Sequence, residues 1–237
     1  MTFQSNQSGF TECAQPEFEL DVETVDFLNR EHKSLASFRK RIFDFTLAGL
    51  AFIFTLPMLL IVAGLIKFHD GGQVLFSQKR VGVNGKLFKC YKFRSMVSDA
   101  QERLDHLLET DPDARAEWES TQKLRCDPRI TRLGSFLRKS SLDELPQLWN
   151  IVRGDMSIVG PRPIVENEIA KYGPYFEEYA AVRPGLTGRW QVSGRSETTY
   201  QQRVEHDAAY VQNWSFWSDV WIVMRTVPAI LMSKGAV

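Results

Sequence analysis

Hydrophobic and polar residues are distributed very unevenly along this chain. Residues 42–66 are almost all apolar, and the single acid among them, Asp44, lies near the start of the run. As a straight helix this run would be roughly 37 Å long, which exceeds the ~30 Å hydrocarbon core of a bilayer. The alternative is a buried core helix of a soluble domain, but such domains rarely contain so long an unbroken apolar run. The pattern therefore predicts one membrane helix.

The flanks of this run and its central proline predict a helix that enters the membrane and returns to the same side. Residues 39–41 are all basic and Lys67 follows the run, so the flanking charges do not indicate which end of the helix lies outside the cell. Pro57 cannot donate to the carbonyl of Ile53, and its ring crowds that turn, so we expect a kink. A re-entrant helix keeps both basic flanks on one side of the membrane, whereas a straight span separates them.

The rest of the chain predicts short helices and a few short strands. Segments 73–76 and 86–93 predict strands joined by a turn at Asn84-Gly85. Asp111-Pro112 is typical of an N-cap followed by a first helical residue. We expect helices over 99–109, 112–124, 142–152, 165–172, 200–213 and 217–231, the last interrupted at Pro228, and a further strand over 189–192. The predicted fold is α/β, rich in helix with a small β element, with one re-entrant membrane helix and interfacial helices.

Three parts follow from this organisation. Residues 1–38 form an acidic tail that we expect to be mostly disordered, because it is polar and rich in Ser and Gln. The tail lacks the basic start and apolar core of a signal peptide. Residues 39–69 form the re-entrant membrane helix, and residues 70–237 form a catalytic domain on the membrane surface.

Composition and charge exclude several classes of protein. The chain has 29 basic and 29 acidic residues, so it lacks the basic excess of a dedicated nucleic-acid binder. Its three cysteines are widely spaced, which argues against a disulfide framework or a zinc site and fits a reducing compartment. Residues 79–94 carry six basic side chains and no acid, which indicates either a binder of phosphates and anionic lipid heads or a solvated charged surface.

The adjacent carboxylates of Asp143 and Glu144 are the first candidates for a catalytic or metal-binding site. Pro146 is tolerated only in the first turn of a helix, so the helix starts near Leu142 or Asp143 and both acids lie at or beside its N-terminus. The pair would suit a hard cation such as Mg²⁺, and an ionised Asp can attack phosphorus. The alternative is that Asp143 is an N-cap and Glu144 a first-turn acid.

Basic residues and one further acid extend this candidate site. Pro161 and Pro163 fix the backbone around Arg162, so its guanidinium is placed to hold a diphosphate, unless it simply faces solvent in a rigid turn. Asp207 lies on an apolar helical face and must be paired with an Arg or a metal, or be functional. The basic side chains that could extend the same positive pocket are Lys92, Arg94, Arg138 and Arg153.

Taken together, these segments resemble the bacterial sugar transferase family, the monotopic phosphoglycosyl transferases. The resemblance covers roughly residues 38–227. Within the family, the chain is similar to the short exopolysaccharide-initiating members that transfer galactose or glucose phosphate to undecaprenyl phosphate. Its motifs are 40–44 (KRIFD), 91–96 (YKFRSM), 127–131 (DPRIT), 141–147 (SLDELPQ), 154–163 (GDMSIVGPRP), 183–188 (RPGLTG) and 207–214. Departures are Ser95 for the usual Thr, Arg189-Trp190 for Trp-Ala, and Leu56 for the Ser before the membrane proline.

The resemblance implies a reaction and roles for these residues. It implies transfer of a sugar-1-phosphate from a UDP-sugar to polyprenyl phosphate, with release of UMP, at the cytoplasmic face of the bacterial inner membrane. It further implies Asp143 as nucleophile and Mg²⁺ ligand, Glu144 as its support, Arg162 as a phosphate-binding residue and Asp207 as part of the active site. The expected partners are therefore the UDP-sugar, polyprenyl phosphate and membrane lipid.

Several alternatives stay open at this point. A non-catalytic membrane adaptor for polysaccharide assembly would keep the basic face and need neither acid. A Mg²⁺-dependent membrane phosphohydrolase would release sugar phosphate without an acceptor. The sequence does not distinguish UDP-galactose from UDP-glucose. The Trp-rich segment 214–221 is suited either to the membrane interface or to a contact between subunits, so a homo-oligomer is also open.

Overall fold

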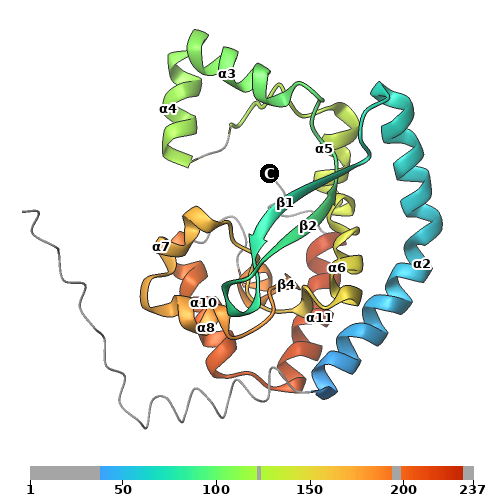
Figure 1. Cartoon of the computed structure of the whole chain (residues 1–237), viewed down its shortest axis with the longest axis vertical. Helices are drawn as coiled ribbons and strands as arrows, with labels where there is room; N and C mark the ends of the chain where they lie inside the picture. Colours follow the sequence, from blue (N-terminus) through green and yellow to red (C-terminus); the bar gives the residue numbers. More distant parts are fainter. Residues whose placement is uncertain (1–37, 122–123, 194–198, 232–237) are drawn as a thin grey trace, which may run out of the picture.

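The computed structural model describes residues 38–121, 124–193 and 199–231. The predicted acidic tail, apart from Phe38, lies outside these residues. The described chain is rich in helix, with two small sheets between a long helix on one side and a group of short helices on the other (Figure 1). Its principal helices are α2 (Phe38–Asp70), α3 (Ala100–Thr110), α4 (Pro112–Thr121), α5 (Arg132–Lys139), α6 (Gln147–Arg153), α7 (Ile169–Tyr172), α8 (Phe176–Ala180), α9 (Arg189–Val192), α10 (Tyr200–Gln212) and α11 (Phe216–Leu231). Single 3₁₀ turns are η1 (Val83–Gly85), η2 (Leu142–Glu144), η3 (Glu166–Glu168) and η4 (Gly173–Tyr175).

The strands form two separate pairs. β1 (Leu75–Val81) and β2 (Leu87–Phe93) are antiparallel, and the predicted turn at Asn84-Gly85 joins them with both residues at positive φ, 55° and 70°. The first strand, predicted over 73–76, begins two residues later and extends to Val81. β3 (Ser157–Val159) and β4 (Gly185–Thr187) are parallel. They approach so closely that a Cβ at Gly185 would lie 2.1 Å from the backbone nitrogen of Gly160.

Two further predictions about secondary structure are wrong. Residues 189–192 form the short helix α9, not a strand, because the segment packs against α10 and α11 and buries Trp190 there. Glycines on either side of a short apolar segment do not distinguish these outcomes. α11 continues through Pro228 without interruption, since a proline near a helix end removes only one backbone hydrogen bond. The helix-rich fold with small β elements is confirmed.

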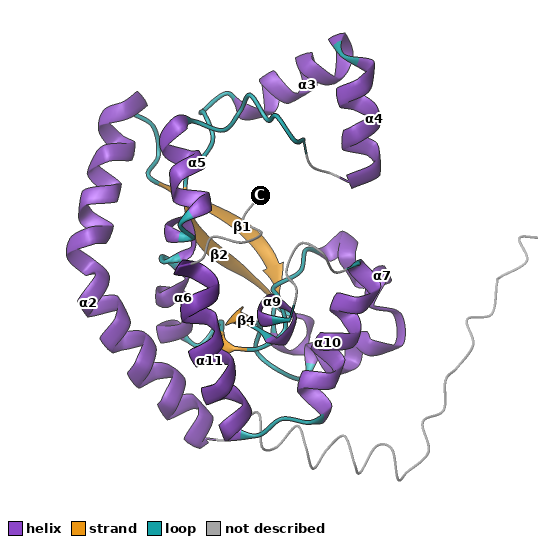
Figure 2. Cartoon of the chain, turned by 180° about the vertical axis from the view of Figure 1, so that it is seen from behind, coloured by secondary structure: helices purple, strands orange, loops and turns teal. Residues whose placement is uncertain are grey.

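The apolar run forms one helix, α2, which continues past Pro57 and arches along one side of the molecule (Figures 1 and 2). It is the one described helix long and apolar enough to cross a membrane, by length and composition. Its outer flank exposes large apolar side chains, including Ile53, Phe54 and Phe68. Its inner flank is packed against the rest of the chain, so α2 has a protein face and an uncovered apolar face.

The inner flank of α2 contributes to two of the three hydrophobic cores. Ala48 packs in one core with Ile151 and Met156. Further along the helix, the second core joins side chains from α2, β2 and α5: Leu59, Val62, Ile66, Phe93 and Leu137. A third core lies away from α2 and contains Val81, Ile164, Tyr172, Tyr179 and Val204. Helix α2 and the segments that it covers are therefore packed as one body.

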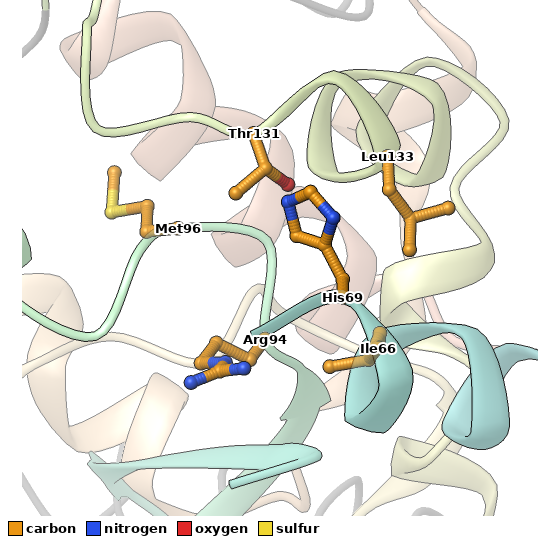
Figure 3. A pocket seen from close by; sticks show the side chains of 6 residues that line it. All are labelled: Ile66, His69, Arg94, Met96, Thr131 and Leu133. Carbon is orange, nitrogen blue, oxygen red and sulfur yellow. The ribbon is translucent and has the colours of Figure 1, made fainter. Parts of the chain in front are cut away.

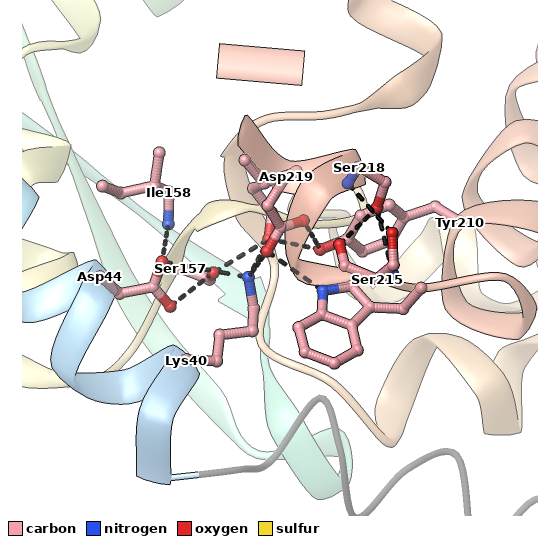
Figure 4. A network of polar contacts seen from close by, with 10 residues as sticks. Lys40, Asp44, Ser157, Ile158, Tyr210, Ser215, Ser218 and Asp219 are labelled. Atoms are coloured by element: carbon pink, nitrogen blue, oxygen red, sulfur yellow. Dashed lines mark hydrogen bonds and ion pairs between the residues drawn. The ribbon is translucent and has the colours of Figure 1, made fainter. Parts of the chain in front are cut away.

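A buried ion pair fixes the start of α2 (Figure 4). Lys40 Nζ donates to Asp219 Oδ2 at 2.6 Å and to the carbonyl oxygen of Val159 at 3.2 Å. Asp219 also accepts hydrogen bonds from the Tyr210 hydroxyl at 2.8 Å and the Trp214 indole N–H at 3.1 Å. Both charged side chains are almost fully buried. Because each charge has several partners, the pair can lie in the interior without an uncompensated charge.

The next turn of α2 adds two more polar attachments. Asp44, the one acid of the apolar run, accepts from the Ser157 hydroxyl at 2.7 Å and from the following backbone N–H at 3.1 Å. Arg41 donates to the carbonyls of Ile151 and Val152, at 2.5 and 2.7 Å. Those carbonyls belong to the last turn of α6, where a positive charge is favourable. The polar residues before and within the run thus bind α2 to β3 and α6.

Replacing Asp219 with Ala should destabilise the protein strongly. The substitution leaves the buried ammonium of Lys40 with only the more distant carboxylate of Asp44, at 4.0 Å. Breaking a buried pair in this way costs about 3–5 kcal/mol of unfolding free energy. Urea unfolding in detergent, followed by tryptophan fluorescence, measures the change. As a control, Asp99→Ala removes an exposed pair with Arg103 and should leave the midpoint unchanged. Equal midpoints for the two variants would contradict the structural role of the Lys40–Asp219 pair.

Candidate active site

Asp143 and Glu144 lie in a tight turn between α5 and α6. Ser141 precedes them with φ 56°, a conformation that L-residues rarely adopt, and η2 forms the turn itself. Pro146 follows and has no N–H to donate, so α6 starts only after it. The single helix expected over 142–152 is therefore wrong in its first turn. The acids nevertheless lie beside a helix N-terminus, which is one of the two positions predicted.

Glu144 is held by Lys92 from strand β2. Lys92 Nζ lies 2.6 Å from Glu144 Oε1, and both side chains remain about one-third exposed. Burial alone would raise the pKa of Glu144, but the charge and hydrogen bond of Lys92, with the charges of Arg162 and Arg80, hold that pKa below its usual value. Glu144 is therefore an ionised, oriented acid at neutral pH.

Asp143 has a different environment from its neighbour. Its side chain is buried, and it has no ion-pair partner among the described residues. Burial raises the pKa of Asp143 to about 6; the charge of Lys92 opposes this shift and that of Glu144 adds to it. A carboxylate of this kind is mostly ionised at neutral pH but poorly stabilised in that form. It is suited to nucleophilic attack or to binding a cation brought in by a substrate.

Arg138 is close enough to Asp143 for their charges to interact. It extends from α5, and its Nε donates to the Ser95 hydroxyl at 2.9 Å. Burial lowers the pKa of Arg138, and the negative charge of Asp143 opposes that shift. Arg138 is therefore a positive charge near Asp143 that the Ser95 hydroxyl helps to fix.

Arg162 approaches the acids from the loop after β3. Its charge contributes to the lowered pKa of Glu144, and its guanidinium carbon lies 5.5 Å from the ring centre of Trp190. The loop is held by hydrogen bonds between the two glycine-containing motifs, from Gly160 N to Thr187 O at 3.0 Å and from Gly185 N to the loop carbonyl of Pro161 at 2.8 Å. The prolines and this pairing fix the backbone that presents Arg162.

Asp207 lies behind Arg162 on the buried face of α10. Tyr172 donates to its Oδ2 at 2.9 Å, and the backbone N–H of Arg162 lies 3.4 Å from the same atom. Burial raises the pKa of Asp207 to about 7, against the effect of the Tyr172 hydrogen bond. Among the described residues no ion pair to Asp207 is formed, so the structural salt bridge considered for it is not present there. Asp207 instead supports the Arg162 loop.

Arg94 is the predicted site residue that lies elsewhere. It lines a small pocket at the end of α2. The other residues that line this pocket are Ile66, His69, Met96, Thr131 and Leu133 (Figure 3). The structure thus gathers Lys92, Arg138 and Arg162 around the two acids but places Arg94 beside the membrane helix.

Comparison with known proteins decides the family. The model of the bacterial sugar transferase family matches residues 35–233. The chain belongs to the bacterial sugar transferase family. The match includes α2, the two acids and Asp207, and it confirms the resemblance that the motifs indicated.

Several curated members of the family are similar over most of this chain. Exopolysaccharide production protein ExoY of Sinorhizobium fredii is 50% identical over 204 residues, which are 86% of this chain and 90% of the relative. Undecaprenyl-phosphate galactose phosphotransferase of Salmonella typhimurium is 46% identical over 219 residues, 92% of this chain and 46% of the relative. UDP-glucose:undecaprenyl-phosphate glucose-1-phosphate transferase of Caulobacter vibrioides is 42% identical over 206 residues, which are 84% of this chain and 72% of the relative.

The residues of this sugar transferase fit Mg²⁺ only together with a phosphate ligand. Among the described residues, no group of three His, Cys, Asp or Glu side chains could hold a metal ion. Mg²⁺ commonly binds one or two carboxylates and completes its shell with water and substrate phosphates. Asp143 is suited to this mode because it has no ion-pair partner, whereas Glu144 is already bound by Lys92. Asp143 would thus be the protein ligand of an ion that enters with substrate.

Several residues of the site were not found from the sequence. Arg80 acts on both Arg162 and Glu144 through its charge, and Tyr172 binds Asp207. Trp190 and Arg203 lie against each other, with the Arg203 guanidinium carbon 4.4 Å from the ring centre. The interactions of Arg80 with Arg162 and of Tyr172 with Asp207 join segments far apart in the chain, and Trp190 and Arg203 belong to different helices. A local sequence pattern therefore does not predict these interactions. The one available signal was the departure from the family pattern at Arg189-Trp190.

Proposed function

We propose that this family member transfers a hexose-1-phosphate from a UDP-hexose to undecaprenyl phosphate, as the first membrane step of exopolysaccharide synthesis. The observation that carries the proposal is the buried carboxylate of Asp143 next to Glu144, which Lys92 holds at 2.6 Å. The names of the relatives support the substrates and the pathway step. Since relatives are named for galactose and for glucose, UDP-galactose and UDP-glucose are the two donors proposed.

The proposed reaction has two displacements at phosphorus. In the first, a carboxylate oxygen of Asp143 forms a bond to the sugar-linked phosphorus, the bond from that phosphorus to the bridging oxygen breaks, and UMP leaves. In the second, an oxygen of polyprenyl phosphate attacks the same phosphorus and the bond to Asp143 breaks. The product is a polyprenyl-diphosphate hexose, and the free carboxylate is regenerated.

The positive side chains supply the charge neutralisation that phosphoryl transfer needs. Lys92 orients Glu144 and places an ammonium beside Asp143, while Arg138 and Arg162 approach from different elements. Mg²⁺ bound at Asp143 would further neutralise the phosphate oxygens. Transfer of this kind depends mainly on positioning and charge stabilisation, so fixed cations around one nucleophile are the main requirement.

We also propose that α2 is re-entrant and holds the catalytic part on the cytoplasmic face of the inner membrane. Lys40 at its start is bonded to Asp219, and Ile66 near its end packs with Phe93, so both ends contact the same folded body. A straight span would carry one end to the opposite side and remove one set of these contacts. The uncovered apolar flank of α2 would then lie in lipid, with exposed Trp217 and Trp221 of α11 at the interface.

Asp143→Ala should abolish transfer, because it removes the nucleophile. Incubation of the wild-type protein with UDP-hexose alone should give an intact mass increased by one hexose phosphate, and the variant should give none. Turnover measured as UMP release should fall by at least roughly 10³-fold. Asp105→Ala, an exposed acid of α3, is the matched control and should keep full activity. Full turnover in Asp143→Ala would contradict the covalent mechanism, and adduct formation with neither UDP-galactose nor UDP-glucose would contradict the proposed donors.

Formation of the adduct should depend on pH through Asp143. Its pKa is raised to about 6, and only the ionised carboxylate attacks, so the rate of UMP release in the first displacement should fall as the pH drops through about 6. Glu144→Gln removes a negative charge that raises this pKa, and it should therefore move the acid limb to lower pH. Rapid-quench measurement of UMP with UDP-hexose alone gives both profiles. A limb that moves to higher pH in Glu144→Gln would refute this electrostatic coupling.

The membrane arrangement can be tested by labelling the two ends of α2. With Cys13, Cys90 and Cys126 replaced by Ser, Arg39→Cys and Phe68→Cys each introduce one thiol. An impermeant maleimide should label neither variant in intact spheroplasts and both in inverted vesicles, because both ends lie on the cytoplasmic side. Labelling of one variant from each side would establish a straight span instead.

A further inference from the structure

Two guanidinium groups share the indole of Trp190. The Arg162 carbon Cζ lies 5.5 Å from the ring centre and the Arg203 carbon Cζ lies 4.4 Å from it. Arg203 is also 5.5 Å from the ring centre of Tyr200. Trp190 is only 6% exposed, so its position is fixed by packing. Two side chains from different elements, the loop after β3 and helix α10, are therefore brought together by one aromatic ring.

The charge of Asp207 acts on both cations, but no carboxylate among the described residues forms an ion pair with either of them. Burial lowers the pKa of Arg203, and the charge of Arg162 lowers it further. Two neighbouring positive charges repel each other, and the cost is greater in a partly desolvated place. An anion bound between them would remove that cost.

Several buried polar atoms next to the pair also lack a partner. They are Arg203 Nε, Trp190 Nε1 and Asp207 Oδ1. The side chains of Trp190 and Asp207 are more than nine-tenths buried. Buried donors and acceptors are normally satisfied, so three unsatisfied atoms around two guanidinium groups indicate a place that a polar ligand completes.

We propose that Arg162 and Arg203, held on Trp190, bind the diphosphate of the nucleotide donor. This inference rests on the proposed function and adds two residues to it. Arg203 is a substrate-binding residue, and Trp190 is a positioning residue that fixes both guanidinium groups. A diphosphate has enough oxygens to accept bonds from two planar guanidinium forks at once.

The position of the pair favours the donor over the lipid phosphate. Arg203 extends from α10, whose neighbouring residue Val204 packs in the core with Val81 and Tyr172, away from α2. Arg138 extends from α5, whose residue Leu137 packs in the core shared with α2. Figures 1 and 2 show α10 and α2 on opposite sides of the strands. A lipid phosphate would approach along α2 and meet Arg138, whereas a soluble nucleotide would approach from α10.

Binding of UDP and steady-state kinetics of the full chain in detergent test this assignment. Arg203→Ala should raise the calorimetric Kd for UDP about 10- to 100-fold, as expected for loss of a charged hydrogen bond. It should raise the KM for UDP-hexose by a similar factor and leave the KM for polyprenyl phosphate within about twofold. Trp190→Ala should weaken UDP binding, and Trp190→Phe should restore most of it, because a phenyl ring can still bind both cations.

Arg225→Ala provides a matched control. Arg225 lies 5.0 Å from the ring centre of Trp221 on α11, so the variant removes a similar contact outside the site and should leave UDP binding unchanged. Thermal unfolding identifies any variant that fails to fold, and Arg203→Lys, which keeps the charge but not the fork, should then show an intermediate Kd.

Three results would overturn the inference. They are an unchanged Kd for UDP in folded Arg203→Ala, a rise confined to the KM for polyprenyl phosphate, and no binding of UDP by the wild-type protein. A wild-type protein that binds UDP but transfers no hexose phosphate would refute the proposed function alone, and calorimetry would still decide the role of Arg203.

Discussion

The buried ion pair between Lys40 and Asp219 determines where the membrane helix lies on the rest of the molecule. Removing two charges from water costs several kcal/mol per ion unless each finds partners, and here the ammonium has a carboxylate and a carbonyl. Arg41 extends the attachment to the last turn of α6. The turn that carries Asp143 immediately precedes α6, so a short path through α6 sets the distance between α2 and Asp143.

Three carboxylates in this region show how environment divides roles among identical groups. Lys92 lies against Glu144 and keeps its pKa low, burial raises the pKa of Asp143 to about 6, and deeper burial raises that of Asp207 to about 7. The first is a fixed negative charge, the second is an ionisable group with little stabilisation, and the third is a largely structural acid bonded to Tyr172. Such separation of pKa values within a small space is typical of active sites.

Local patterns were sufficient for the features that depend on neighbouring residues. The apolar run, the Asn84-Gly85 turn, the acids before Pro146 and the rigid loop at Arg162 were all predicted. The predictions failed where tertiary packing decides, as in α9, which buries Trp190 against α10 and α11 instead of extending as a strand. Arg94 was grouped with Lys92 in one positive pocket, but it lines a separate pocket at the end of α2.

Long-range polar contacts could not be predicted from one sequence. Lys40 and Asp219 lie 179 positions apart, and Asp44 and Ser157 lie 113 apart. Neither partner has a local pattern that names the other. Asp44 was noticed as the one acid of the apolar run, yet only the fold explains it, since β3 supplies both of its donors.

The shared cores of α2 have a consequence for how this chain can be divided. Ala48 packs on Ile151, while Leu59, Val62 and Ile66 cover Phe93 and Leu137, so the segment after residue 70 does not enclose its own interior. A truncated fragment without α2 would expose those surfaces and remove Lys40, the basic partner of Asp219. Helix α2 is thus a structural component of the enzyme, and chimaeras between relatives must exchange α2 together with the segment that it covers.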